Sequence, residues 1–261
     1  MAKSAKITAE KRHSEICQIL HVEQQVSVPE LAKKFGVTPM TVHRDLDKLQ
    51  QAGRIKKTWG GAKPTERMVF EFDFAKRRHA NKKEKQAIAK KAFEFISPGQ
   101  KIILDTGTTT LELSYLLRDI KDITVITPSL AVASVLQFSS GIETILLGGI
   151  IRKGSPDLTG VVTEKVLDMF MVDIAFQGAD GIGLDGTLFT EDMRIVKVDQ
   201  KIREQAATNY ILADSSKIGK TALATNGFVS QADALIIDDA IGDEVKNNFE
   251  DMGTTVITVK A

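Results

Sequence analysis

The chain has 261 residues, of which 43% are hydrophobic and 26% charged, a composition typical of a globular protein with room for two domains. It contains a single cysteine, and it lacks both an apolar run long enough to cross a membrane and an N-terminal signal segment. These features argue against a disulfide-rich secreted protein and a membrane protein, and we expect a cytoplasmic protein.

The net charge of +1 conceals an uneven distribution along the chain. Residues 1–94 hold 21 Lys and Arg against 11 Asp and Glu, whereas residues 95–261 hold 14 against 23. A basic N-terminal part beside an acidic C-terminal part indicates that a polyanion binds the N-terminal part alone.

The N-terminal part shows the pattern of three short helices. Apolar residues on one face predict a first helix over residues 8–22. Ser27 and Glu30 have the spacing of a capping box, which begins a second helix. Thr38 can cap a third helix, and Pro39 suits its first position because the missing N–H has no partner there anyway. The second and third helices therefore follow each other closely.

The third helix is expected to bury one face, on which Val42, Leu46 and Leu49 recur at helical spacing. Its opposite face is then free to enter a DNA major groove as part of a helix-turn-helix, although a small helical subdomain with a solvated face would show the same stripe. Residues 54–58 alternate as a strand and residues 59–61 reverse the chain, which predicts a β-hairpin wing. The expected DNA-binding residues are Thr38, Pro39, Met40, Thr41, His43, Arg44, Lys48, Lys56, Lys57 and Trp59.

The string ELAKKFGVTPMTVHRDLDKLQQAGRIKKTWGGA, residues 30–62, resembles the N-terminal signature of the DeoR family of bacterial transcriptional regulators. The family usually has two consecutive arginines where this chain has His43 and Arg44. We interpret residues 1–66 as a winged helix-turn-helix domain that binds a double-stranded DNA operator. Because one recognition helix covers too few base pairs for a unique genomic address, we expect a homo-oligomer, either a dimer or a tetramer.

Residues 67–83 are expected to be an irregular linker between domains. The basic run at residues 75–85 either touches DNA phosphates or forms a solvated surface. From residue 84 onward, apolar strands alternate with helices, including a long helix near residues 194–209. Strands separated by helices of this size run mostly parallel, so residues 84–261 are predicted to form an α/β domain.

Three loops of this domain carry polar residues at the carboxyl ends of predicted strands, where ligands collect in open α/β sheets. In the first, residues 105–110, a glycine and a helix N-terminus suit a phosphate, although ordinary helix capping explains the same residues. In the second, Asp180 can accept hydrogen bonds from sugar hydroxyls. In the third, Lys217 can pair with a phosphate or carboxylate. The expected effector-binding residues are Asp105, Thr106, Gly107, Thr108, Thr109, Thr110, Asp180, Lys197 and Lys217.

The strings LDTGTTTLELSYLL, GADGI and ADSSKIG also resemble motifs of the DeoR effector domain, which is similar in fold to ribose-5-phosphate isomerase. The resemblance implies that the ligand is a phosphorylated sugar or a metabolite derived from one. Two positions depart from the pattern. Gly181 stands where the isomerases have a second acidic residue, and Pro128 stands where the family commonly has asparagine.

The sequence is therefore interpreted as a transcriptional regulator of sugar metabolism, with a repressor as the leading hypothesis and activation left open. The effector is expected to lower DNA affinity, and no cofactor, metal or membrane partner is expected. A sugar-phosphate isomerase-like enzyme with a DNA-binding anchor is one alternative, but it needs a positioned base where this chain has Gly181. A DNA-binding scaffold whose second domain only assembles oligomers is another.

Overall fold

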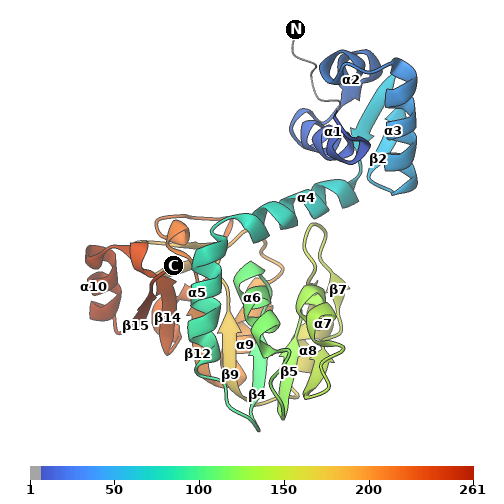
Figure 1. The fold of residues 1–261 in the computed structure, drawn as a ribbon. Helices are drawn as coiled ribbons and strands as arrows, with labels where there is room; N and C mark the ends of the chain where they lie inside the picture. The colour runs from blue at the N-terminus through green and yellow to red at the C-terminus, as the bar shows by residue number, and fades with distance from the viewer. Residues whose placement is uncertain (1–6) are drawn as a thin grey trace. The chain divides into compact units, whose positions relative to one another are not determined.

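The chain divides into two units, Met1–Arg77 and Arg78–Ala261 (Figure 1). The computed structural model describes residues 7–261, apart from the side chains of residues 70–72. The elements that begin in the first unit are α1 (Ala9–Glu23), β1 (Val26–Ser27), α2 (Val28–Phe35), α3 (Pro39–Gln51), β2 (Ile55–Thr58), β3 (Gly61–Pro64) and α4 (Glu66–His79).

The first unit contains the three helices and the hairpin that the sequence predicts. The Ser27 hydroxyl accepts a hydrogen bond from the Glu30 amide, and the Glu30 carboxylate accepts one from the Ser27 amide, so the capping box is present. Thr38 caps α3 through the amide of Thr41, and Pro39 occupies the first position. The buried stripe of α3 packs with α1 and α2 in one core. The winged helix-turn-helix is therefore confirmed.

A two-residue strand that the sequence did not reveal joins the wing to α2. In this antiparallel contact, Val26 lies opposite Ala62 and Ser27 lies opposite Gly61. A Cβ atom on Gly61 would lie 1.9 Å from the Val26 carbonyl oxygen, so the two strands approach closely because residue 61 is glycine. The base of the wing is thereby fixed to the start of α2.

The segment after the wing corrects the expectation of an irregular linker, because residues 66–79 form the continuous helix α4. The Thr65 hydroxyl accepts a hydrogen bond from the Met68 amide at 3.2 Å, and the Met68 side chain is buried in the core of the first unit. The helix thus begins with a cap and an apolar anchor. Three basic residues, 76–78, occupy its last turn, where positive charge complements the helix dipole.

The second unit alternates helices and strands. Its main helices are α5 (Lys82–Phe93), α6 (Thr108–Leu117), α7 (Leu130–Leu136), α8 (Val161–Leu167), α9 (Val196–Glu204) and α10 (Asp243–Asp251), with short 3₁₀ turns η1 (Ser215–Lys217), η2 (Val229–Gln231) and η3 (Asp239–Ile241). Its strands are β4 (Lys101–Leu104), β5 (Ile123–Thr127), β6 (Ile142–Leu146), β7 (Ile150–Ile151), β8 (Leu158–Thr159), β9 (Val172–Gln177), β10 (Gly181–Ile182), β11 (Thr187–Thr190), β12 (Ala206–Leu212), β13 (Ala224–Phe228), β14 (Ala234–Asp238) and β15 (Thr255–Val259).

Seven of these strands form one parallel sheet in the order β15, β14, β12, β9, β4, β5, β6. Along the chain, strands are added outward from β4 to β6 in one direction and then from β9 to β15 in the other. The direction therefore switches between β4 and β9, which pair directly through Leu104 and Phe176. The mostly parallel α/β fold is confirmed, and such a switch point is where open α/β sheets bind ligands.

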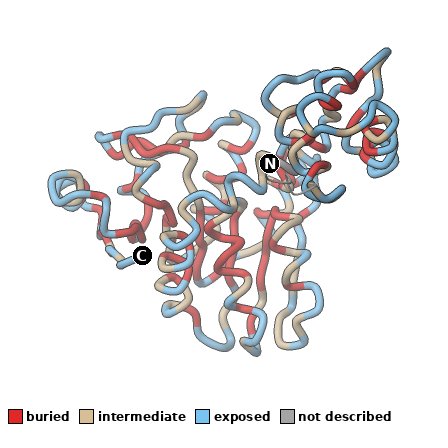
Figure 2. The backbone as a smooth tube through the Cα atoms, turned by 45° about the horizontal axis from the view of Figure 1, so that its top comes forward, coloured by how far each residue is buried: buried red, intermediate tan, exposed pale blue. Residues whose placement is uncertain are grey.

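Both faces of this sheet are buried, as parallel sheets require. Ile102 and Leu104 of β4 join the core beneath α5, α6 and α7, whereas Ile103 joins the core that contains Val198 and Ile202 of α9. Figure 2 shows buried segments, in red, running along the strands. The sheet is the middle of three layers, so its strand ends are fixed from both sides.

The prediction of a long helix near residues 194–209 is wrong in its C-terminal part. Helix α9 ends at Glu204, and Ala206–Leu212 form β12, which pairs with β9 on one side and β14 on the other. The Asn209 side-chain amide donates to the carbonyl of Arg203 at 3.1 Å and so marks the turn between helix and strand. Pairing on both edges of a central strand outweighs the helical pattern of its first residues.

Two small antiparallel sheets were also missed. One contains β10, β11 and β13, and the other contains β7 and β8. Three of these five strands have only two residues each, which is too short for alternation to show in a sequence. Both sheets lie in segments that the sequence analysis left as loops.

Candidate functional site

The outer face of α3 holds the residues expected to meet DNA, and the buried stripe of the helix lies on the opposite face. From the start of the helix, the exposed or half-buried residues of this face are Thr38, Pro39, Met40, Thr41, His43, Arg44 and Lys48. A helix that presents hydroxyl, imidazole and guanidinium donors on one face has the groups that read base edges in a major groove.

A buried ion pair, which the sequence analysis missed, orients this helix. Asp45 of α3 accepts hydrogen bonds from the Arg12 guanidinium at 2.6 and 2.9 Å and lies 2.8 Å from His13 Nε2. Burial alone would raise the pKa of Asp45, but the hydrogen bonds from Arg12 and His13 outweigh it and leave the pKa below its ordinary value. The ionised carboxylate therefore links the buried side of α3 to α1.

The wing carries its positive charge on both strands. Lys56 lies directly opposite Lys63 in the β2–β3 register, and both side chains are exposed. Like charges placed directly opposite each other are destabilising, and the sequence analysis did not name Lys63. Lys57 instead lies 2.7 Å from Asp47 of α3. Trp59 is fully exposed at the tip.

In the second unit, the loop from Asp105 to Thr110 ends β4 and starts α6. Gly107 stands at the N-cap with φ of 123°, and no side chain caps the helix. Thr106 and Thr108 are half-buried, whereas Thr109 and Thr110 are buried. The first-turn N–H groups of α6 thus lack a side-chain acceptor, which leaves them available to an anion.

The structure brings the three predicted loops together at the carboxyl edge of the sheet. A Cβ atom on Gly178, after β9, would lie 3.4 Å from the carbonyl oxygen of Thr106, after β4. Ile182 forms a bridge with Ile218, and the Gly219 amide donates to the Ile182 carbonyl at 2.8 Å. The loops after β4, β9 and β12 are therefore in contact one after another.

The predicted side chains of these loops differ in what they do. The Asp180 carboxylate accepts hydrogen bonds from the Glu191 amide at 2.9 Å and from the Thr190 hydroxyl at 3.2 Å. Lys217 is half-buried in the η1 turn after β12. Lys197 is exposed on α9, whose buried face points to the core. Whether any of them contacts a ligand stays a prediction.

Asp105 is the most unusual group at this edge. Only 4% of it is exposed, and its Oδ1 atom is buried without a hydrogen-bond partner. Burial, reinforced by repulsion from Asp157, raises its pKa to about 7, although Arg203 and two backbone amides oppose the rise. Burial and the charge of Asp105 also hold the pKa of Asp199 well above its ordinary value. The charge state of each carboxyl therefore affects the pKa of the other.

Arg203 and Asn226 complete the surroundings of this pair. The Arg203 guanidinium donates to Gln177 Oε1 at 3.3 Å and to Asn226 Oδ1 at 3.1 Å, and the Asn226 amide donates to Asp199. Asp199, Arg203 and Asn226 come from α9 and β13, and nothing in the sequence marks them as neighbours of residue 105. Arg203 thus places a positive charge, and Asn226 a hydrogen-bond donor, beside the buried carboxyls.

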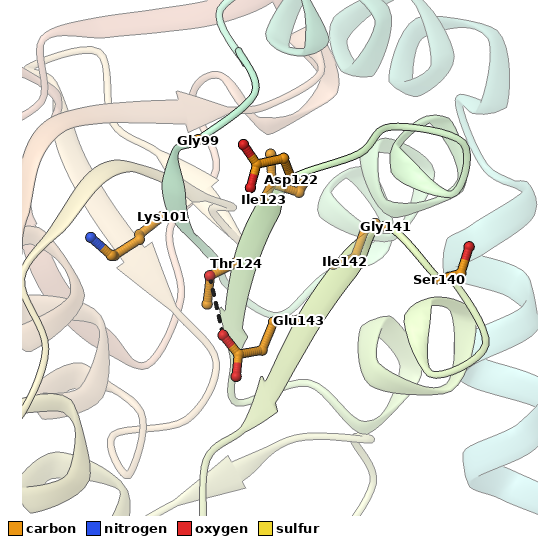
Figure 3. Close-up of a pocket in the computed structure, with 9 residues that line it drawn as sticks. All are labelled: Gly99, Lys101, Asp122, Ile123, Thr124, Ser140, Gly141, Ile142 and Glu143. Atoms are coloured by element: carbon orange, nitrogen blue, oxygen red, sulfur yellow. Dashed lines mark hydrogen bonds between the residues drawn. The ribbon is translucent and has the colours of Figure 1, made fainter.

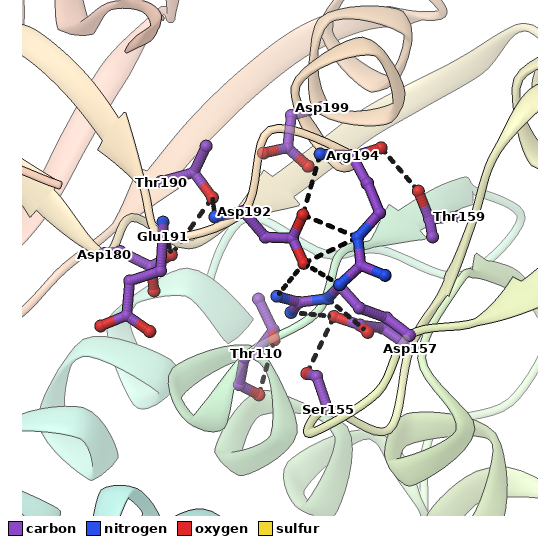
Figure 4. A network of polar contacts seen from close by, with 12 residues as sticks. Thr110, Ser155, Asp157, Thr159, Asp180, Thr190, Glu191, Asp192, Arg194 and Asp199 are labelled. Atoms are coloured by element: carbon purple, nitrogen blue, oxygen red, sulfur yellow. Dashed lines mark hydrogen bonds and ion pairs between the residues drawn. The ribbon is translucent and has the colours of Figure 1, made fainter. Parts of the chain in front are cut away.

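A second network closes one side of the loops (Figure 4). Arg152 lies 2.5 Å from Asp157, which also accepts from the Ser155 hydroxyl at 2.9 Å. Arg152 also lies 3.6 Å from Asp192. Hydrogen bonds from Arg194 lower the pKa of Asp192 to about 2. These ion pairs fasten the β7–β8 hairpin to the segment between β11 and α9, so they set the rim of the loops.

A hollow of about 430 Å³ lies at the other end of the sheet (Figure 3). It is lined by the starts of β4, β5 and β6, with Lys101, Asp122 and Glu143 among its polar side chains. Because ligands of open α/β sheets bind at the carboxyl ends of the strands, we do not assign this hollow to the effector. Among the residues that the structure describes, no group of three or more His, Cys, Asp or Glu side chains is placed to hold a metal ion.

The fold and the two sites define a class of protein. A winged helix-turn-helix with an exposed recognition face is joined through α4 to an α/β unit with polar loops gathered at its switch point. This combination is that of a DNA-binding regulator with a ligand-sensing domain.

Comparison with known proteins identifies the family. Residues 12–67 match the DeoR-like helix-turn-helix domain, and residues 80–239 match the DeoR C terminal sensor domain. The chain belongs to the DeoR family of transcriptional regulators.

Two relatives and one solved structure illustrate the similarity. A putative aga operon transcriptional repressor of Escherichia coli O157:H7 is 30% identical over 95% of this chain and 93% of its own. The glycerol-3-phosphate regulon repressor of Escherichia coli K12 is 30% identical over 87% of this chain and 90% of its own. Ribose 5-phosphate isomerase A of Methanocaldococcus jannaschii is 21% identical, with a TM-score of 0.41, over 53% of this chain and 55% of that enzyme.

Both family models and both relatives describe regulators and not enzymes. No helix that the structure describes is long and apolar enough to cross a membrane.

The raised pKa of Asp105 makes a prediction about stability. The unfolded carboxyl loses its proton near pH 4, whereas the folded one keeps it to about pH 7, so the wild type loses stability as the pH rises through this window. Asn cannot ionise. We expect Asp105→Asn to be more stable than the wild type above pH 7, by roughly 1–4 kcal/mol, and the difference to shrink toward pH 4. Thermal unfolding of the full-length chain between pH 4 and 8 measures this.

Asp119→Asn is the matched control for this experiment, because Asp119 is exposed on the surface of the same unit. Its stability should follow the wild-type pH profile. Parallel profiles for Asp105→Asn and the wild type would mean that the buried carboxyl is not held protonated.

Proposed function

We propose that the chain represses an operon of sugar metabolism and that a phosphorylated sugar, or a metabolite derived from one, releases it from operator DNA. The loops gathered at the switch point carry this proposal. The loop that leads to the uncapped start of α6 contacts the loop after β9, which in turn contacts the loop that bears Lys217. A helix N-terminus and a lysine together suit a phosphate. The names of two relatives, an aga operon repressor and a glycerol-3-phosphate regulon repressor, support it. We place the protein in the cytoplasm, where bacterial operators lie.

The contacts of Asp180 argue against the isomerase-like alternative. One oxygen of its carboxylate, Oδ2, accepts hydrogen bonds from both the Glu191 amide and the Thr190 hydroxyl, so Asp180 holds the end of β11 in place. The next residue is Gly181, which offers no second carboxylate. Both observations favour a binding site over a catalytic one.

The proposed recognition of DNA is tested at Arg44. Arg44→Ala removes an exposed guanidinium from the outer face of α3 without touching the buried stripe. We expect it to weaken specific operator binding by about 1–3 kcal/mol and to leave thermal stability and effector binding unchanged. The measurement uses an operator selected from random duplexes by the full-length wild-type chain.

Lys56→Ala serves as the contrasting variant. Because Lys56 faces Lys63 on the wing, its removal should weaken binding to all duplexes alike and make affinity less steeply dependent on salt. Normal operator binding by Arg44→Ala would show that the orientation assigned to α3 on DNA is wrong.

The proposed oligomer is tested by sedimentation. Four apolar side chains, Ile150, Ile151, Val161 and Val162, are 57–69% exposed beside the edge strand β6. A Cβ atom on Gly160 would touch Ile150, and one on Gly148 would touch Val162, which places the two pairs on one surface. We propose that a second copy of the chain covers it, because a two-fold operator needs two recognition helices.

Sedimentation equilibrium should therefore show the wild type as a dimer or a tetramer. Val162→Asp should shift the distribution toward monomer, because the interface would then bury an unpaired charge. A wild-type monomer both free and on DNA would refute the proposal.

Effector recognition is tested at Lys217. Loss of a charge-assisted contact costs about 1.5–3 kcal/mol, so Lys217→Ala should weaken effector binding roughly tenfold to a hundredfold while operator binding persists. The variant would then behave as a super-repressor. Thr108→Val should share this behaviour, because it replaces a hydroxyl that can donate to a phosphate oxygen with a methyl group. Operator release is measured against effector concentration for each variant.

The effector is first sought by thermal shift with glycerol 3-phosphate, ribose 5-phosphate and fructose 1-phosphate, since a ligand of the native state raises stability. Lys220→Ala is the matched control, because Lys220 is exposed in the same segment. Identical operator-release curves for Lys217→Ala and the wild type would show that the effector's phosphate does not bind at Lys217. A scaffold without a ligand would show no stabilisation by any of the three.

A further inference from the structure

Asn81 occupies the junction between α4 and α5 in an unusual conformation. It has φ of 50° and ψ of 41°, in the left-handed region that asparagine tolerates better than most residues. It stands at the N-cap of α5, yet its side chain does not cap that helix. Its amide group is therefore free to bond elsewhere, and asparagine at this position needs another explanation.

The side-chain amide of Asn81 reaches the η1 turn instead. It donates to Asp214 Oδ1 at 2.7 Å and to Ser216 Oγ at 2.9 Å. Asp214 is buried and caps the turn through the Ser216 amide, and the Ser215 amide donates to Asp238 at 2.6 Å. Asn81 is thus part of the hydrogen bonding that shapes this turn.

Lys217 is the last residue of the same turn. Its backbone amide donates to the Asp214 carbonyl at 2.9 Å, so the lysine and the acceptors of Asn81 belong to one hydrogen-bonded unit. A ligand that displaces Lys217 therefore displaces the partners of Asn81.

The last turn of α4 also contacts the other phosphate-binding element. Arg78 donates to the Tyr115 hydroxyl at 2.8 Å, and its guanidinium lies 5.2 Å from the centre of the Tyr115 ring. Tyr115 is on α6, whose first turn is the proposed phosphate cradle. On α5, Gln86 donates to Glu112 of α6 at 3.2 Å. The junction of α4 and α5 is consequently bonded to both elements that would close on a phosphate.

We propose that the Asn81 side-chain amide couples effector binding to operator release, an inference that rests on the proposed function. Phosphate bound between α6 and Lys217 shifts η1 relative to α6, and the Asn81 hydrogen bonds follow the turn. Because Asn81 follows the end of α4 by two residues, the shift passes along the chain into a continuous helix that begins just after the wing. The effector then changes operator affinity through a difference in these bonds between two conformations.

Asn81→Gly tests the coupling cleanly. Glycine accepts the left-handed backbone without strain and removes the amide. Operator affinity of the full-length chain is measured with and without a pool of glycerol 3-phosphate, ribose 5-phosphate and fructose 1-phosphate. The wild-type ratio should lie in the range of about 5–150, typical of allosteric coupling. For Asn81→Gly we expect a ratio near 1, with effector binding by calorimetry and effector-free operator binding both retained.

Two further variants control for indirect effects. Ser216→Ala removes one of the two acceptors and should give an intermediate ratio. Asp122→Gly replaces another residue with positive φ, in a turn at the opposite end of the sheet, and should keep the wild-type ratio. A reduced ratio in Asp122→Gly would assign the effect to backbone relaxation and overturn the proposal.

The remaining outcomes separate the inference from the proposed function. A wild-type ratio in Asn81→Gly would overturn the coupling role while the effector function stands. Loss of effector binding in Asn81→Gly would also overturn it, because the amide would then belong to the ligand site. A wild-type protein whose operator affinity ignores the whole pool would overturn the proposed function, and the coupling with it.

Discussion

Direct pairing of β4 with β9 is the constraint on which the second unit depends. The crossovers on either side of this pair lead away in opposite directions. No crossover therefore passes over the loops that follow the two strands, and these loops contact each other. The approach of Gly178 to the Thr106 carbonyl depends on that pairing, and the bridge between Ile182 and Ile218 extends the contact to the η1 turn. A ligand can therefore touch three loops that are far apart in the sequence.

Charge distribution gives the two units different physical characters. In the first unit, ionised Asp45 is satisfied by Arg12 and His13, while opposed lysines on the wing remain unneutralised. In the second unit, Asp105 and Asp199 are buried near Arg203, and burial raises the pKa of both carboxyls. The first unit thus has exposed positive charge that suits a polyanion, whereas the second unit has buried carboxyls whose ionisation is unfavourable.

The features that the sequence revealed are local. A capping box at Ser27 and a proline at the start of α3 are read from residues within one turn of each other, and the strand-and-helix alternation fixed the α/β class. Contacts between distant residues were missed for the same reason. Arg12 and Asp45 are 33 positions apart, and Asn81 and Asp214 are 133 apart, so no periodicity relates them. The helical pattern before β12 was misleading because it describes propensity, whereas pairing on both edges decided the strand.

The open start of α6 has a consequence for folding as well as for binding. Helices α2 and α3 satisfy part of their first turns with the side chains of Ser27 and Thr38. Helix α6 begins at Gly107 without one. An anion that bonds to those amides would act as a reversible helix cap. The fraction of molecules in which this turn is locally unfolded would then fall as the anion concentration rises.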